Sequence, residues 1–136
     1  MSPMIEFGGV EVPESMPLPA TGESITIELL KVDGPKPSKS SGNPMVELTF
    51  AVLAPGEIWN NMQLWEYLVL TPAEHLRTCI KAKNIGKSFG LTDAEMVAAG
   101  GVDFPSLVGR TCTVVLKKDK DREGVETRRI KSFVAA

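Results

Sequence analysis

Apolar and polar residues alternate along five segments of the chain, which is the pattern of β-strands with one buried face. These segments are residues 24–32, 45–53, 62–70, 111–118 and 125–134. In the third segment, Leu64 and Leu68 share one face with Glu66, whereas Trp65 and Tyr67 fall on the other. The pattern therefore predicts five strands, the third of which has an aromatic second face.

The period of the pattern changes after residue 70, where a helix start appears. Thr71 is an N-cap residue, Pro72 suits the first helical position, and Glu74 has the spacing of a capping box. We expect this helix to end at Asn84 and Gly86. We expect one face of this helix to pack on the core, and with it the side chain of Cys79. The residues on that face are Leu76, Cys79, Ile80 and Lys83.

A second helix start follows at Thr92, with Glu95 again at the capping-box spacing, and the segment stops at Gly100-Gly101. The order of elements is thus three strands, a helical insert and a two-stranded hairpin. This is the order of the OB-fold, a small five-stranded Greek-key barrel. We therefore predict a mainly β protein, with one OB-fold domain over residues 23–136 and a helical insert between strands three and four.

Residues 1–22 have a different composition, with four prolines and three glycines. They are predicted to form an irregular arm, with a short edge strand at Phe7–Val12. The total of 136 residues suits a single domain. The chain lacks an apolar run of the roughly 20 residues that cross a bilayer, and its start lacks the pattern of a signal peptide. We expect a cytoplasmic protein that does not bind membranes.

The sequence offers little catalytic chemistry. It contains no H-E-x-x-H or P-loop motif. The single histidine, His75, and the two cysteines, Cys79 and Cys112, do not make a four-ligand zinc set. We interpret the cysteines as buried thiols in a reducing compartment, and Glu66 as a hydrogen-bonded strand residue. A metal-dependent nuclease would need clustered carboxylates, so we expect no catalytic residue, metal ion or cofactor.

The net charge of the chain is only −2, but it is unevenly distributed. Residues 1–30 hold five acids and no Lys or Arg, whereas residues 110–131 hold eight bases and four acids. Such asymmetry is typical of a protein with an anionic partner on one side, and it also occurs in ordinary solvated hairpins. Charge alone leaves both explanations open.

Two predicted connections between strands are basic. The first contains Lys36 and Lys39 and follows Lys31. Turn chemistry explains its second half, Gly42–Pro44, but does not require the lysines. The second connection contains Lys117, Lys118, Lys120 and Arg122. In an OB-fold these two loops frame the oligonucleotide groove, so we predict that they bind phosphates from both sides.

Aromatic residues are candidates for stacking on nucleic-acid bases. Trp65 and Tyr67 share one face of the third strand, so both are stacking platforms or both are core, and we favour exposure. Trp59 precedes Asn60-Asn61 in a predicted turn, and we expect it to be partly exposed.

The last predicted strand combines cations with a ring. Placing Ile130 and Val134 inward puts three residues on the opposite face: Arg129, Lys131 and Phe133. Two cations alternating with a ring suit a sugar–phosphate backbone with stacked bases. We therefore predict that this face forms the floor of the groove.

Four segments together resemble phage-encoded single-stranded-DNA-binding proteins of the OB-fold type. They are residues 39–45, 64–72, 107–112 and 128–133. The likeness lies in their order and spacing, and it covers about residues 22–134. The resemblance implies a small replication or recombination protein that coats single strands in the bacterial host. Phage or host replication proteins are further partners that it implies.

Two classes of function follow from the sequence. The first is non-enzymatic, largely sequence-independent binding of single-stranded DNA in phage replication or recombination. The alternative is a protein-interaction module on the same barrel, such as a phage structural adaptor or an inhibitor of a host factor. The acidity of residues 1–30 favours the alternative. The sequence leaves open DNA versus RNA, and whether the protein forms a homo-oligomer.

Overall fold

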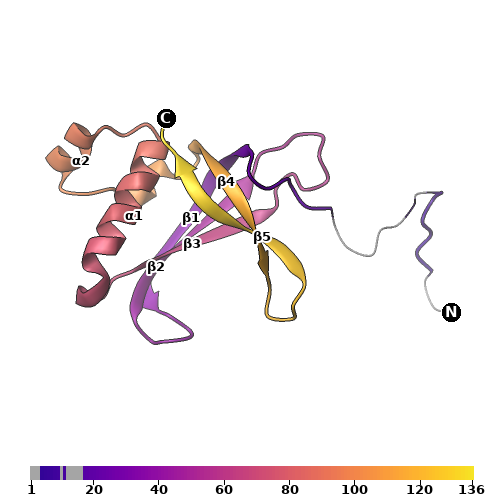
Figure 1. The fold of residues 1–136 in the computed structure, drawn as a ribbon, viewed down its shortest axis with the longest axis horizontal. Helices are drawn as coiled ribbons and strands as arrows, with labels where there is room; N and C mark the ends of the chain where they lie inside the picture. The colour runs from indigo at the N-terminus through magenta and orange to yellow at the C-terminus, as the bar shows by residue number, and fades with distance from the viewer. Residues whose placement is uncertain (1–3, 10, 12–16) are drawn as a thin grey trace.

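Five antiparallel strands form one sheet in the computed structural model, which describes residues 4–9, 11 and 17–136 (Figure 1). The strands are β1 (Ser24–Pro37), β2 (Pro44–Val52), β3 (Gln63–Val69), β4 (Thr111–Lys120) and β5 (Glu126–Val134). Their order in the sheet is β3-β2-β1-β4-β5, so β3 and β5 are the two edges. The five predicted strands are confirmed. Helical segments between β3 and β4 make the class mixed α/β rather than mainly β.

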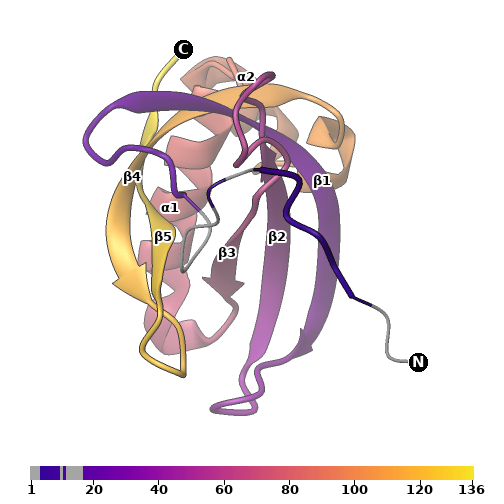
Figure 2. The ribbon, with the colours of Figure 1, turned by 90° about the vertical axis from the view of Figure 1, so that its right-hand side faces the viewer.

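The sheet curves because β1 pairs with two neighbours along different parts of its length. Residues 24–28 pair with β4 and residues 27–37 pair with β2, and the pairing with β2 is interrupted by two register shifts. Such irregularities bend a strand and increase its twist. At the second shift, Gly34 has a φ of 121°, and a Cβ there would lie 2.6 Å from the carbonyl oxygen of Met45. Figure 2 shows the result, with β5 lying near β3 and helix α1 behind them.

The core lies on the apolar face that the alternation predicts. Leu48, Phe50 and Val52 of β2 are fully buried, as is Leu29 of β1. Phe50 is the largest of these side chains, and its ring packs against that of Phe133, with the centroids 5.9 Å apart. An aromatic pair thus connects β2 with β5 in the hydrophobic core.

The prediction that Phe133 lies on the outward face of the last strand is therefore wrong. The register of β4 and β5 shifts where Val115 pairs with Ser132 and Leu116 pairs with Ile130, which leaves Lys131 as an extra residue. Such a bulge reverses the inward and outward alternation beyond it. Ile130 points inward as predicted, but Phe133 turns into the core and Val134 is 36% exposed.

The first helical segment begins as a 3-10 turn, η1 (Pro72–Glu74), and continues as α1 (His75–Ser88). The side chain of Thr71 makes no capping hydrogen bond, so the capping box predicted there is wrong. The helix also continues beyond its predicted end to Ser88. Pro72 does occupy the first turn, as expected from its fixed φ and missing N–H.

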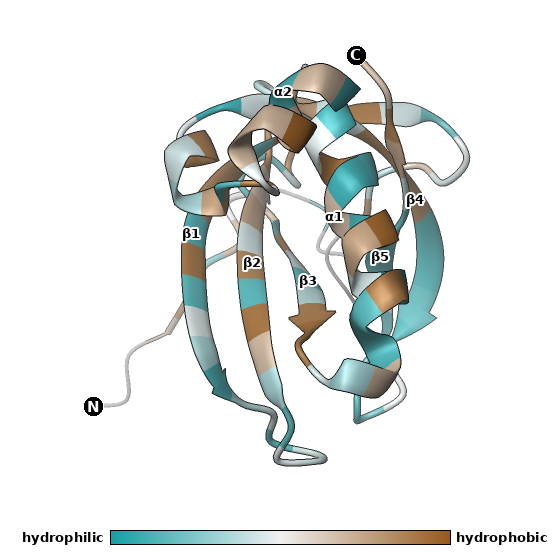
Figure 3. Cartoon of the chain, turned by 90° about the vertical axis from the view of Figure 1, so that its left-hand side faces the viewer, coloured by the Kyte–Doolittle hydropathy of each residue, from teal (hydrophilic) through white to brown (hydrophobic). Residues whose placement is uncertain are grey.

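The buried face of α1 is not the one that the sequence pattern predicted. Leu76 is 73% exposed, Ile80 is 53% exposed, and Cys79 is also exposed, so the prediction that this face packs on the core is wrong. Figure 3 shows hydrophobic bands on the outer side of α1. Ile85 is fully buried instead, near the end of the helix.

Polar side chains explain this orientation of α1. Thr78 donates a hydrogen bond to the carbonyl oxygen of Val69, and Ser88 donates one of 3.0 Å to that of Thr113. Both acceptors belong to strands of the sheet. These contacts help to hold the side of the helix that carries Thr78 and Ser88 against the sheet, and they leave Leu76 and Ile80 outside.

The second helix, α2 (Asp93–Ala99), forms as predicted. The backbone N–H of Glu95 donates to the Thr92 hydroxyl at 3.1 Å, and the backbone N–H of Thr92 donates to the Glu95 carboxylate at 3.2 Å. The helix ends at Gly100, which has a left-handed φ of 75°. A 3-10 turn, η2 (Phe104–Leu107), then buries its two apolar ends and leads into β4.

The N-terminal arm contacts the sheet through the last residues before β1. Pro19 is buried, and its carbonyl oxygen accepts a 2.7 Å hydrogen bond from Arg128. The N–H of Gly22 donates to the carbonyl oxygen of Leu116. Of the predicted edge strand at Phe7–Val12, residues 7–9 run into a turn, and residues 10 and 12 lie outside the described residues. Among the helices of the described chain, none is long and apolar enough to cross a membrane.

The two cysteines are expected to differ sharply in reactivity. Cys112 is only 5% exposed, and burial raises the pKa of its thiol to about 11, whereas Cys79 is exposed. In the native protein, an aromatic disulfide reagent should modify Cys79 rapidly and Cys112 only after unfolding. The Cys79→Ser variant is the control, and rapid modification of that variant would contradict the burial of Cys112.

The raised pKa of Cys112 predicts how the free energy of unfolding changes with pH in the alkaline range. The pKa of Cys112 is raised from 9.0 to about 11 in the folded protein, so the unfolded thiol ionises first as the pH rises. The free energy of unfolding should therefore fall between about pH 9 and pH 11. A Cys112→Ala variant should lose this part of the pH dependence in urea titrations, and an unchanged alkaline slope would contradict the assignment.

Candidate nucleic-acid interface

The outward face of β3 carries two exposed rings. Trp65 is 46% exposed and Tyr67 is 41% exposed, in agreement with the exposure that the alternation favoured. In the register of β2 and β3, Thr49 pairs with Trp65 and Glu47 pairs with Tyr67. Directly paired residues of antiparallel strands share a face, so the Glu47 carboxylate lies beside the Tyr67 ring.

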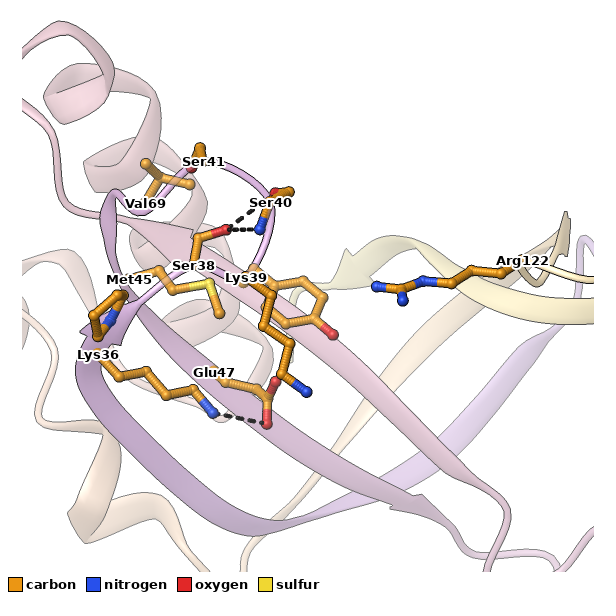
Figure 4. A pocket seen from close by; sticks show the side chains of 11 residues that line it. Lys36, Ser38, Lys39, Ser40, Ser41, Met45, Glu47, Val69 and Arg122 are labelled. Carbon is orange, nitrogen blue, oxygen red and sulfur yellow. Dashed lines mark hydrogen bonds and ion pairs between the residues drawn. The ribbon is translucent and has the colours of Figure 1, made fainter.

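A pocket of about 590 Å³ opens next to Tyr67 (Figure 4), and we call it the loop pocket. Its walls include Lys36 near the end of β1, Lys39 from the β1–β2 connection, and Arg122 from the connection between β4 and β5. Lys36 thus belongs to a strand and not to the loop in which it was predicted, because β1 continues to Pro37 and pairs with β2 there. Figure 4 shows the Arg122 side chain directed toward the pocket from the side opposite the β1–β2 loop. Residues from both predicted binding loops, far apart in sequence, therefore border one cavity.

The β1–β2 loop is held in a defined turn. The N–H of Ser38 donates to the carbonyl oxygen of Asn43 at 2.8 Å, and the N–H of Gly42 donates to that of Ser38 at 2.9 Å. Gly42 has a φ of 73°, which favours glycine. The predicted turn chemistry is thus present, and it holds Lys39 at an exposed position near the tip of the loop.

Lys36 differs from Lys39 because two carboxylates already surround its charge. Its ammonium donates a 2.7 Å hydrogen bond to Asp33, and it lies 3.6 Å from the Glu47 carboxylate. The bond to Asp33 raises the pKa of Lys36 and lowers the pKa of Asp33. In the described part of the chain, Lys39 and Arg122 form no ion pair. They are therefore the stronger candidates to bind a phosphate.

A second pocket, of about 420 Å³, lies between the edges of β3 and β5, and we call it the edge pocket. Trp65 and Tyr67 line it from β3, Lys120 from the end of β4 and Arg129 from β5. Tyr67 borders both pockets, so the two form a continuous surface. Burial raises the pKa of Tyr67, Glu47 acts in the same direction, and the positive charge of Arg129 acts against them.

Glu66 is a hydrogen-bonded carboxylate of β3, as predicted. It is 6% exposed and forms an ion pair with Lys81 of α1. One of its oxygens accepts the backbone N–H of Tyr67 at 3.1 Å, and Lys81 also donates to the carbonyl oxygen of Tyr67 at 3.0 Å. Sequence reasoning missed Lys81 because it assigned a different face of α1 to the sheet. The pair fixes the backbone at Tyr67, and hence the position of the ring.

Arg128 was also missed as a structural residue. Its side chain is only 9% exposed, because it bonds Pro19 of the arm and lies 3.4 Å from the carboxylate of Glu126. No pattern in the sequence separates it from its neighbour Arg129, which is exposed. The difference arises from the packing of the arm on β5.

The structure leaves six predicted site residues outside both pockets: Lys31, Trp59, Lys117, Lys118, Lys131 and Phe133. Trp59 is half-buried against the core beyond the far end of β2. Lys117 and Lys118 belong to β4 rather than to a loop, since this strand continues to Lys120. The turn itself starts at Asp121, whose carboxylate accepts the backbone N–H groups of residues 123 and 125.

No group of three or more His, Cys, Asp or Glu side chains in the described part of the chain could hold a metal ion. His75 is exposed on α1, with its Nε2 3.6 Å from the Cys79 sulfur.

A scan of the chain against protein-family models finds no match, and a search of the curated proteins finds none either.

Proposed function

We propose that the protein is a non-enzymatic, largely sequence-independent binder of single-stranded DNA on an OB-type barrel. The strand order, with β1 between β2 and β4 and a helix between β3 and β4, supports this barrel topology. One observation carries the functional proposal. Lys39 and Arg122 come from the two loops that would frame an OB groove, and they border one pocket with Tyr67.

In this proposal, cationic side chains bind the phosphates of a single strand and aromatic rings stack on its bases. Lys39 and Arg122 bind phosphates over the loop pocket, and Arg129 with Lys120 does the same over the edge pocket. Trp65 and Tyr67 stack on successive bases, and each stacked base contributes roughly 1–3 kcal/mol whatever its identity. Lys36, already compensated by two carboxylates, fixes the loop rather than binding phosphate. The resemblance to phage proteins implies a role in replication or recombination.

Titration of a fluorescent oligo-dT with the full chain tests the proposal. Binding should be tighter than micromolar at low salt. The logarithm of the association constant should fall with the logarithm of the salt concentration, with a slope of about −2 to −3 for three or four phosphate contacts. Micromolar or weaker binding at low salt, or a flat salt dependence, would contradict the proposal.

Removing the two unpaired cations of the loop pocket should reduce this slope. The Lys39→Ala/Arg122→Ala variant should make it less negative by about 1.4, since each lost phosphate contact changes it by roughly 0.7. The matched control is Arg77→Ala/Lys83→Ala on α1, which removes the same charge from exposed positions away from both pockets. Equal changes of the salt slope in the two double variants would show that the phosphate contacts lie outside the loop pocket.

One observation favours the second candidate, a protein-interaction module. Leu76 and Ile80 on α1 and Val97 on α2 are exposed apolar side chains, the last at 81%. A phage or host protein could bind the exposed face of α1 that carries Leu76 and Ile80. A pull-down of a defined replication or host protein, abolished by Leu76→Ala/Ile80→Ala and accompanied by no binding of oligo-dT, would replace the first candidate by this one.

A further inference from the structure

Glu47 is an unexpected residue in a pocket proposed to bind a polyanion. Its side chain is 20% exposed and contributes to the wall of the loop pocket. Glu47 forms an ion pair with Lys36 at 3.6 Å, but Asp33 accepts a shorter hydrogen bond of 2.7 Å from the same ammonium, so Glu47 is the more distant of two carboxylates around one cation. A carboxylate here repels phosphates, so its presence points to a contact with another part of the ligand.

The position of Glu47 suits a contact with a base. It pairs with Tyr67 across β2 and β3, so the carboxylate lies next to the ring on which a base would stack. Figure 4 shows the Lys39 side chain extending toward Glu47 from the loop, with Arg122 on the opposite side. The pocket thus combines a ring, an acceptor beside the ring, and cations at its rim.

The chemistry of a carboxylate selects among the bases. An ionised carboxylate only accepts hydrogen bonds, and it binds best when two parallel donors meet its two oxygens. The Watson–Crick edge of guanine presents adjacent N1–H and N2–H donors. Adenine and cytosine each place an acceptor nitrogen beside their amino group, and thymine places its single N–H between two carbonyls. Single-stranded bases are commonly read on this edge.

We propose that the loop pocket binds one guanine of a single strand, with the Glu47 carboxylate accepting its N1–H and N2–H groups. This inference rests on the proposed function and adds one preferred position to otherwise sequence-independent binding. Glu47 is then a specificity-determining residue, and Tyr67 supplies the stacking surface.

Competition between oligonucleotides tests the inference on the full chain. The probes are oligo-dT of about 12 nucleotides, within the usual site size of such a domain, and the same strand with one central dG, dA, dC or inosine. We expect the dG strand to bind about tenfold more tightly than oligo-dT. The inosine strand should be intermediate, because it retains N1–H and lacks the amino group.

Variants distinguish recognition of guanine by Glu47 from a general repulsion between its charge and the phosphates. Glu47→Leu removes the acceptor, and it should abolish the preference for dG while leaving oligo-dT binding equal or stronger. Asp33→Asn is the control, because it removes a negative charge beside Lys36 without touching the pocket wall, and it should keep the preference. If Glu47→Leu does not fold, the comparison of dG with inosine in the natural chain still decides the matter.

The outcomes distinguish the two levels of the proposal. Equal affinity for the dG and dT strands, with a steep salt slope, overturns the guanine site and leaves the single-strand binder intact. A Glu47→Leu variant that strengthens all strands equally also overturns the guanine site. Failure of every strand to bind at low salt overturns both proposals.

Discussion

Replacing Phe50 by alanine is expected to lower the free energy of unfolding by about 3–5 kcal/mol. Phe50 is fully buried and forms the aromatic contact with Phe133 that joins β2 to β5 across the core. Its removal leaves a cavity between β2 and β5, where neighbouring strands can relax only partly. Urea unfolding followed by circular dichroism measures the effect.

The matched control for this variant is Phe7→Ala. Phe7 is 64% exposed, so the same change of side chain should alter the free energy of unfolding by no more than about 0.5 kcal/mol. If the two variants lost similar stability, the core position of Phe50 would be wrong.

Removing both exposed rings of β3 is expected to have the largest effect on binding. A Trp65→Ala/Tyr67→Ala variant should bind oligo-dT at least about thirtyfold more weakly, because each lost stacking contact costs roughly 1–3 kcal/mol. The fold should survive, since both side chains lie on the outward face and are substantially exposed. Fluorescence anisotropy at constant low salt measures the loss.

The control for the ring variant is Leu76→Ala/Ile80→Ala, which removes two exposed apolar side chains from the outer face of α1. It should leave oligo-dT binding unchanged. Loss of binding in the control, with retention in the ring variant, would move the interface from β3 to the helix.

The strands could be predicted from the sequence because their alternation is regular and each buries one face. The prediction failed where one extra residue changed the alternation. The bulge at Lys131 exchanges the orientations of Phe133 and Val134, and no local pattern indicates it. The prediction of which face of α1 is buried failed for a different reason. Hydrogen bonds of Thr78 and Ser88 to distant strands decide which side of this helix is buried.

The candidate site was predictable to a similar extent. Composition and loop position placed Lys39 and Arg122 among the predicted phosphate-binding residues, but did not separate them from the other cations of the two loops. Strand alternation placed Trp65 and Tyr67 on one face, but did not decide that this face is exposed. The compensation of Lys36 by Asp33 and Glu47 depends on a register between β1 and β2 that the sequence does not reveal. Long-range packing likewise separates the buried Arg128 from the exposed Arg129.

The chain contains two tryptophans, and their positions allow a direct test of the central claim. Trp65 lines the edge pocket, whereas Trp59 is half-buried against the core and lies outside both pockets. Titration of Trp59→Phe with oligo-dT should quench the remaining fluorescence strongly, because a base stacks on Trp65. The Trp65→Phe variant should bind with little quenching. Quenching confined to Trp59, or absent from both variants, would contradict a single-stranded-DNA interface on this face.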